Sequence, residues 1–196
     1  MTDPEAPDLI ETAPVVPDAA LDRPIALVGM MGCGKSTVGR RLARRLALPF
    51  VDSDQEVETA AGCPVSEVFE RFGEAAFRQG EYKVLARLLD GRRKVIATGG
   101  GAFAEPGTRD LIRARAVTVW LKADLDTLVA RTARRDTRPL LRGPDPRAKL
   151  ARLLDRRTPD YAQADIHVVS ADGPHGRVVD AIIDALTAHL EENTAS

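Results

Sequence analysis

The feature that most constrains this chain is a glycine-rich segment, residues 29–36, which reads GMMGCGKS. It satisfies the pattern G-x-x-x-x-G-K-[S/T], which requires a strand before the loop and a helix after it. An apolar run at 25–28 and a helical periodicity over 36–48 meet both requirements. The glycines allow backbone N–H groups to surround phosphate oxygens at the positive end of the helix. The segment therefore predicts a phosphate-binding loop in an α/β domain rather than a chance glycine turn.

Two side chains of this loop carry predicted roles. Lys35 is expected to bridge the β- and γ-phosphates of ATP, and the Ser36 hydroxyl is expected to ligate Mg²⁺. The loop thus predicts ATP as co-substrate, Mg²⁺ as cofactor, and phosphoryl transfer as the chemistry.

The rest of the chain alternates short apolar runs with helical patterns, which is typical of a parallel sheet covered on both faces. The predicted strands are 25–28, 50–51, 94–97, 116–121 and 166–169. The predicted helices are 36–48, 54–61, 65–72, 74–90, 106–115, 124–133, one that ends at about 157, and 174–190. No repeat or linker interrupts them, so residues 23–192 are expected to form a single domain.

Composition excludes several classes of protein. With 196 residues, 44% of them hydrophobic, and a net charge of −1, the chain has no overall field that would attract nucleic acid or anionic membrane. No apolar run approaches the ~18–20 residues that span a bilayer. Two cysteines form neither a disulfide framework nor a metal-spaced pair, which fits a reducing cytoplasm. Residues 1–22, acidic and proline-rich, lack the features of a secretion signal and are expected to be a disordered tail.

The metal-binding carboxylate is expected at an unusual place. The third predicted strand ends in Thr98 and glycines, without an acid. Asp52, which closes the second strand, is the nearest candidate by topology. Asp54 lies two residues on, so one carboxylate can face the metal and the other the substrate. The alternative is that either residue only caps the following helix.

Three further groups of residues are candidates for the site. Glycines 99–101 lie at the carboxyl end of a strand, where open α/β sheets bind ligands, although a tight turn is the alternative. Arg78 and Glu81 can pair on a helix, and a surface ion pair without a site role is the alternative. The arginine-rich loop at about 134–145, with Arg131 just before it and Arg138 within it, is expected to be a lid, or else a solvated loop.

Together these pieces resemble the shikimate kinases, small P-loop enzymes similar to nucleoside-monophosphate kinases. The resemblance runs from about residue 25 to 185. It is carried by GCGKSTVGRRLA at 32–43, FVDSD at 50–54, VF at 68–69, GE at 73–74, FR at 77–78, Glu81, the triple glycine, RPLL at 138–141, and RR at 156–157 before P-x-Y at 159–161.

The resemblance implies a three-layer P-loop kinase fold, with a five-stranded parallel sheet of order 2-3-1-4-5, a lid, and a substrate-binding helical segment at about 53–90. It implies the reaction ATP + shikimate → ADP + 3-phosphoshikimate, a step of aromatic amino-acid synthesis. A cytoplasmic monomer is expected, with no nucleic-acid or membrane partner.

The resemblance also implies roles for individual residues. Asp54 would bind the ring hydroxyls and position or deprotonate the 3-hydroxyl, while Asp52 would reach Mg²⁺ through a water. The expected catalytic residues are Lys35, Asp54 and Arg138. The expected ATP-binding residues are Gly32, Cys33, Gly34, Lys35, Ser36, Thr37, Arg131 (against adenine) and Arg138 (on the transferred phosphoryl group). The expected substrate-binding residues are Asp54, Arg78, Gly100, Gly101 and Arg157; the arginines would grip the carboxylate and the glycines would offer backbone contacts. The expected metal site is Ser36 with Asp52.

Two departures from the family pattern and two alternative interpretations remain. The family often has another basic residue soon after the position of Tyr161, where this chain has Ala162 and Gln163, and the N-terminal tail exceeds the minimal family length. A kinase of gluconate or of a nucleoside monophosphate is the second enzymatic interpretation. A nucleotide-binding regulator without catalysis is the interpretation from a different class, although the complete set of Lys35, Ser36, Asp52, Asp54 and Arg138 disfavours it.

Overall fold

The computed structural model describes residues 21–133, 145–170 and 175–194. Its centre is a five-stranded sheet of order β2-β3-β1-β4-β5 in which all neighbouring strands are parallel. The strands are β1 (Ile25–Val28), β2 (Phe50–Asp52), β3 (Val95–Ala97), β4 (Val117–Lys122) and β5 (Ile166–Val169). Both the predicted fold and the predicted strand order are confirmed.

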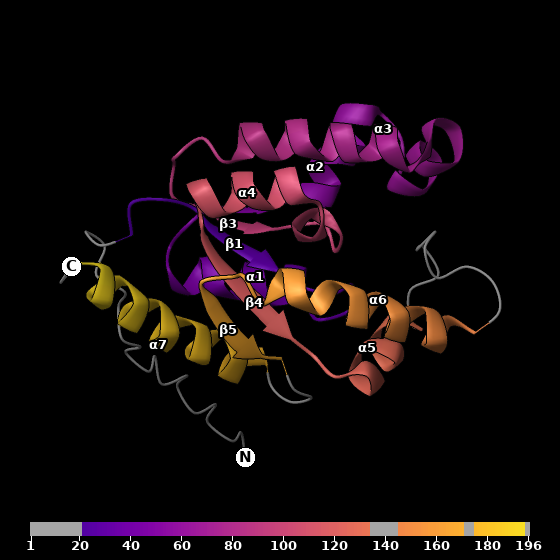
Figure 1. Ribbon diagram of the computed structural model, residues 1–196. Helices are drawn as coiled ribbons and strands as arrows, with labels where there is room; N and C mark the ends of the chain where they lie inside the picture. The colour runs from indigo at the N-terminus through magenta and orange to yellow at the C-terminus, as the bar shows by residue number, and fades with distance from the viewer. Residues whose placement is uncertain (1–20, 134–144, 171–174, 195–196) are drawn as a thin grey trace, which may run out of the picture.

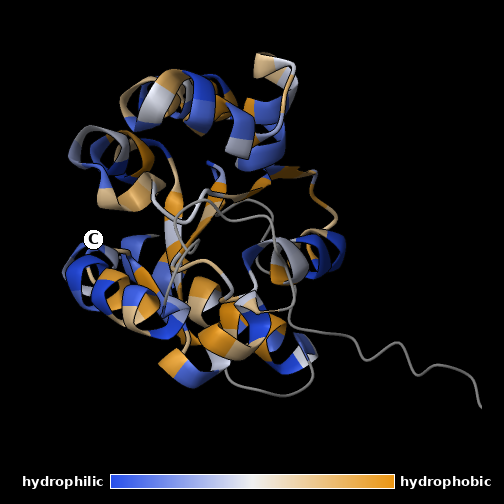
Figure 2. Ribbon diagram, turned by 90° about the vertical axis from the view of Figure 1, so that its right-hand side faces the viewer, coloured by the Kyte–Doolittle hydropathy of each residue, from blue (hydrophilic) through white to orange (hydrophobic). Residues whose placement is uncertain are grey.

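Helices cover the sheet on both faces (Figure 1). They are α1 (Lys35–Arg45), α2 (Ser53–Ala61), α3 (Val65–Leu88), α4 (Pro106–Arg115), α5 (Leu125–Thr132), α6 (Pro146–Tyr161) and α7 (His175–Thr194), with a 3₁₀ turn η1 (Ala102–Ala104). Helices α1 and α7 pack together on one side, and α3 packs against α4 on the other. Helices α5 and α6 lie side by side beyond the carboxyl end of β4. The strands at the centre are mainly hydrophobic, whereas the helices around them carry both hydrophilic and hydrophobic residues (Figure 2).

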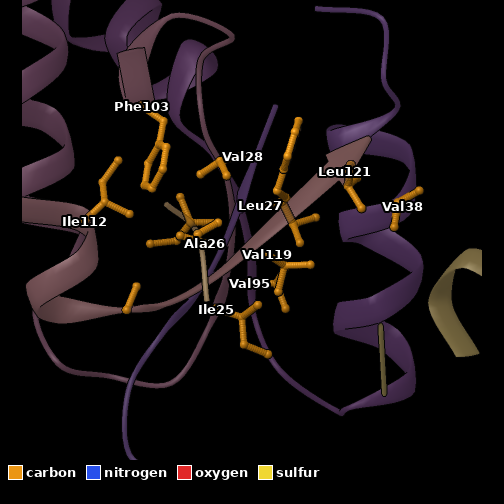
Figure 3. Packing of buried hydrophobic residues seen from close by; sticks show 14 of the residues in the cluster. Ile25, Ala26, Leu27, Val28, Val38, Val95, Phe103, Ile112, Val119 and Leu121 are labelled. Carbon is orange, nitrogen blue, oxygen red and sulfur yellow. The ribbon is translucent and has the colours of Figure 1, made fainter. Parts of the chain in front are cut away.

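The central strand β1 shows why its sequence is wholly apolar. All four of its residues are completely buried. Leu27 points toward α1, where Val38 lies, while Ala26 and Val28 lie on the side of Phe103 (Figure 3). Successive strand residues face opposite sides, so a strand with helices on both faces needs an apolar residue at every position.

Several boundaries differ from the sequence predictions, and α7, for example, runs to Thr194 rather than ending near residue 190. Helix α1 ends at Arg45 rather than near residue 48, because Ala47 turns the chain with a φ of 53°. The two helices predicted on either side of Gly73 form one element, α3, which bends at Gly73, where φ is 78° and ψ is 172°. Helix α6 runs to Tyr161 instead of ending near 157. Pro159 removes only one backbone donor near its end, and the N–H of Ala162 still bonds to the Thr158 carbonyl at 2.9 Å.

Most of the predicted N-terminal tail and of the predicted lid lies outside the described residues. The structure describes neither residues 1–20 nor residues 134–144, which include Arg138. Leu21, which the sequence analysis placed in the tail of residues 1–22, is 5% exposed and packs in the core. Among the described residues, no helix combines the length and apolarity needed to cross a bilayer.

Candidate active site

The phosphate-binding loop leads from β1 into α1. Gly34, which precedes α1, has a φ of 99°, in the left-handed region that favours glycine. The Lys35 side chain is 8% exposed, and its Nζ donates to the carbonyls of Gly29 at 2.7 Å and Met30 at 2.9 Å. The ammonium group is thus held over the loop. Arg131 lies beside the loop, with Nη1 3.9 Å from the position that a Gly34 Cβ would take, and it donates to the Ser170 hydroxyl at 3.3 Å.

Asp52, the last residue of β2, contacts the phosphate-binding loop through its side chain. The predicted metal site needs this proximity, because it combines Asp52 with Ser36. One of the carboxylate oxygens of Asp52 accepts from the Ser36 hydroxyl at 2.6 Å. The other accepts from the backbone N–H of Asp54 at 3.1 Å and caps α2. The two interpretations of Asp52 are therefore compatible, because each oxygen of the carboxylate serves one of them.

The residues present suit Mg²⁺, which needs few protein ligands, better than a metal ion that is coordinated only by protein side chains. Within the described residues, no group of three or more His, Cys, Asp or Glu side chains could hold a metal. Mg²⁺ is commonly bound through one or two carboxylates, with waters and substrate phosphates completing its shell. The Ser36–Asp52 pair beside a phosphate-binding loop offers that donor set.

Two carboxylates converge on Gly99 at the end of β3. A Cβ built on Gly99 would lie 2.4 Å from Oε1 of Glu81 and 2.7 Å from Oδ1 of Asp54. Glu81 is 1% exposed, and burial raises the pKa of its carboxyl to about 7. The charge of Arg78 opposes that rise in the pKa of Glu81, while the charges of Asp54 and Glu105 add to it. Glycine at position 99 is what allows the two acids to reach this edge of the sheet.

Arg78 is held by the same acid. Its Nη1 donates to Oε2 of Glu81 at 2.6 Å, and its Nη2 donates to Glu74 at 3.3 Å. The alternative of a surface ion pair is wrong, because the side chains of Arg78 and Glu81 are 14% and 1% exposed. The guanidinium lies against Gly101, whose Cβ would come within 2.4 Å of Nη2. A largely buried cation beside a glycine backbone is suited to binding an anionic group of a ligand.

Arg157 approaches the triple glycine from the other direction, on α6. It is 5% exposed, and its Nη1 donates to the Gly100 carbonyl at 3.1 Å. The hydroxyl of Tyr161, one helical turn further on, donates to the same carbonyl. The sequence drew attention to Tyr161 only as part of a motif, and its contact with the loop was not foreseen.

Most of these residues line one cavity of about 490 Å³. Its lining includes the predicted Gly32, Gly34, Lys35, Ser36, Thr37, Asp52, Asp54, Arg78, Gly100, Gly101 and Arg131. Of the other predicted residues that the structure describes, Cys33 is completely buried, and Arg157 reaches the Gly100 carbonyl without lining the cavity.

Among the lining residues to which sequence reasoning assigned no ligand-binding role, two are titratable, Glu81 and His175. The three-residue spacing of Glu81 from Arg78 was the signal for the first. His175 begins α7 beside Arg131, and burial together with the charges of Arg41 and Arg131 lowers its pKa.

Comparison with known proteins agrees with this geometry. The sequence model of the shikimate kinase family matches residues 31–187. The shikimate kinase of Rhodopseudomonas palustris is 54% identical over 169 residues, which cover 86% of this chain and 83% of that protein. The shikimate kinase of Paramagnetospirillum magneticum is 53% identical over 186 residues, 95% of each chain.

Solved structures give the same picture. A shikimate kinase from Acinetobacter baumannii in complex with shikimate superposes with a TM-score of 0.82 at 36% identity, covering 85% of this chain and 93% of that one. A gluconokinase from Sinorhizobium meliloti has a TM-score of 0.62 at 19% identity over 89% of this chain and 97% of that one, which shows a shared fold and no more.

Proposed function

Because the chain belongs to the shikimate kinase family, we propose that the cavity between its phosphate-binding loop and its triple glycine is where ATP phosphorylates shikimate. The protein is an ATP-dependent kinase that transfers the γ-phosphate to the 3-hydroxyl of shikimate and releases ADP. One observation carries the proposal about the site. A phosphate-binding loop, a largely buried arginine suited to a carboxylate, and Asp54 all line one cavity.

The donor end of the site would hold ATP. Backbone N–H groups around Gly32 and Gly34 and the ammonium of Lys35 would bind its phosphates, with Thr37 nearby. The hydroxyl of Ser36 would ligate Mg²⁺ directly, and Asp52 would hold it through a water. The ion, when bound, neutralises phosphate charge.

The arginines at the donor end would have separate tasks. Arg131, beside the loop, would lie against adenine. Arg138, in the proposed lid at about 134–145, would contact the transferred phosphoryl group and stabilise its transition-state charge.

The acceptor end would hold the acid. Arg78 and Arg157 would bind the shikimate carboxylate with charge-assisted hydrogen bonds, and the N–H groups of Gly100 and Gly101 would add to them. Asp54 would accept a hydrogen bond from the 3-hydroxyl and aim its oxygen at phosphorus. Phosphoryl transfer asks for such in-line positioning and charge neutralisation rather than covalent chemistry from the protein.

We also propose that the enzyme works as a monomer in a reducing cytoplasm. Both cysteines are free. Among the described residues, three large hydrophobic side chains are exposed, namely Phe72 and Tyr82 on α3 and Val169 on β5. Such scattered exposure is ordinary for monomeric proteins. Size-exclusion chromatography with light scattering should give a mass near 21 kDa.

A coupled assay of ADP release with shikimate, gluconate and AMP side by side tests the function. With ATP present, ADP release is expected when shikimate is the acceptor and not when gluconate or AMP is. It should disappear when EDTA removes Mg²⁺. Turnover with gluconate or AMP but not with shikimate would refute the proposal. Tight ATP binding without turnover of any acceptor would favour the nucleotide-binding regulator.

A further inference from the structure

The Gly100 carbonyl is the point at which α6 meets the substrate loop. It accepts two hydrogen bonds, one from the guanidinium of Arg157 at 3.1 Å and one from the hydroxyl of Tyr161. Both donors come from the last two turns of α6, and the side chains are 5% and 1% exposed. A carbonyl that accepts from two packed side chains is fixed in direction far more firmly than a loop carbonyl that bonds only to water.

Fixing this carbonyl also fixes the N–H of the next residue. The C=O of Gly100 and the N–H of Gly101 belong to one planar trans peptide, in which they point in opposite directions. With the carbonyl directed at α6, the Gly101 N–H faces the other side of the loop. The same two hydrogen bonds polarise the peptide and so strengthen that N–H as a donor.

Tyr161 is itself held rigidly. Its ring stacks on Phe103 with centroids 6.5 Å apart and an interplanar angle of 12°, and it packs against Trp120 at 5.9 Å. Its hydroxyl oxygen also lies 3.7 Å from Sδ of Met30 in the phosphate-binding loop. Burial raises the pKa of Tyr161, so the hydroxyl keeps its proton and remains a donor throughout the neutral range.

The helix that carries Tyr161 is anchored in turn. Nη1 of Arg109, on α4, donates both to Asp160 at 2.9 Å and to the carbonyl of Phe103 at 3.2 Å. The guanidinium of Arg109 therefore ties Asp160, the residue before Tyr161, to the 3₁₀ turn η1 that follows the triple glycine. The position of the Tyr161 hydroxyl relative to the loop is determined by packing and not by a flexible side chain.

From this geometry we propose that Tyr161 is a positioning residue for the acceptor: its hydroxyl holds the Gly100–Gly101 peptide so that the Gly101 N–H faces the substrate carboxylate. This inference rests on the proposed function of the site. In that function Arg157 turns toward the carboxylate and gives up its bond to the Gly100 carbonyl. Tyr161 then remains as the donor to this half-buried oxygen, and the loop keeps its orientation while the substrate is bound.

The variant Tyr161→Phe tests the proposal, because it removes the hydroxyl and keeps the ring between Phe103 and Trp120. We expect the KM for shikimate to rise about 3- to 10-fold, the effect of one neutral hydrogen bond, while the KM for ATP changes less than about twofold. Tyr82→Phe is the matched control, since Tyr82 is the other tyrosine of the chain and is 43% exposed. It should behave as the wild type.

A second readout separates positioning from packing. In protein labelled with ¹⁵N-glycine, the amide signal of Gly101 should move upfield in Tyr161→Phe, because its peptide carbonyl has lost a donor. An unchanged shikimate KM, or equal rises in both KM values together with a lower melting temperature, would overturn the proposal. If the variant melts below the assay temperature, its shikimate dissociation constant at low temperature decides in the same way.

The two proposals fail separately. If the wild type does not phosphorylate shikimate, the function is wrong. If the wild type is active and Tyr161→Phe binds shikimate equally well, only the role of Tyr161 is wrong.

Discussion

Replacing Gly101 by alanine should damage shikimate binding while leaving the fold intact. Gly101 has φ −108° and ψ −11°, which any residue can adopt, so the backbone itself carries no penalty. The new Cβ, however, would lie 2.4 Å from Nη2 of Arg78 and 2.8 Å from both Cζ and Nη1. Ordinary contact begins at 3.4 Å, so the guanidinium must retreat by about 1 Å.

The movement of the guanidinium should lower the affinity for shikimate rather than the stability of the fold. The guanidinium is the far end of a flexible side chain, and a small rotation relieves the overlap. The same movement displaces the cation proposed to bind the carboxylate. A hydrogen bond to a charged group is worth about 1.5–3 kcal/mol, which is about 10- to 100-fold in affinity. A shift of about 1 Å in the bound acid would also reduce kcat, since in-line transfer tolerates little misplacement.

Steady-state kinetics with each substrate varied, together with thermal melting, checks this reasoning. For Gly101→Ala, kcat/KM for shikimate should fall about 10²-fold, with the KM for ATP and the melting temperature nearly unchanged. Gly107→Ala is the control, because a Cβ at Gly107 meets no atom within 4 Å among the described residues. Wild-type kinetics for Gly101→Ala would show that Arg78 is not where the carboxylate binds. A large drop in melting temperature would show that the loop moves instead of the guanidinium.

Three further perturbations probe other parts of the site. Asp54→Asn should lower kcat about 10²-fold or more while ATP still binds, as titration calorimetry would show; near-normal kcat would remove Asp54 from the reaction. Arg138→Ala should lower kcat by at least ~10², with ADP affinity changed far less, and an effect confined to the KM for ATP would assign Arg138 to ground-state binding. Because the pKa of Glu81 is about 7 in the folded protein against 4.5 as the ordinary value, the folded state holds a proton that the unfolded chain releases between these pH values. The stability of the wild type should therefore fall relative to Glu81→Gln as pH rises through this window, by about 3 kcal/mol at most, and urea midpoints at several pH values would measure it. A constant difference between the two proteins would refute the buried-acid account.

The sequence predicted the sheet well because its signals were local. Each strand is a short apolar run between turn residues, and β1 is apolar throughout because it is buried on both faces. The phosphate-binding loop was equally clear, since its glycines and Lys35 are required together at fixed spacing. The strand order came from the family resemblance, as the alternation of strands and helices alone fits several orders.

Side-chain geometry was the part that the sequence could not give. The spacing of Arg78 and Glu81 allowed a pair but did not say that the pair is buried, because burial depends on α3 packing over the end of β3. Tyr161 and Gly100 are 61 positions apart, and no periodicity links them. The end of α6 was placed too early because proline usually marks a helix boundary, whereas here the missing donor falls near the last turn.

The N-termini of α1 and α2 lie at the same edge of the sheet, and their sequences distinguish a helix that binds an anion from a helix that caps itself. Helix α2 begins after Asp52, which caps it, and Asp54 and Glu56 lie in its first turn, so its positive end is already compensated by the chain. Helix α1 begins after Gly34; among the described residues no side chain caps it, and its first turn holds no acid. Only α1 is therefore left with uncompensated N–H groups and a lysine for phosphate. The carboxylate that caps α2 reaches back to the Ser36 hydroxyl at 2.6 Å, so the two starts are joined where Mg²⁺ is proposed to bind. A helix that binds anions and a helix that is self-capped can thus be told apart from the residues around their first turns, before any contact between them is known.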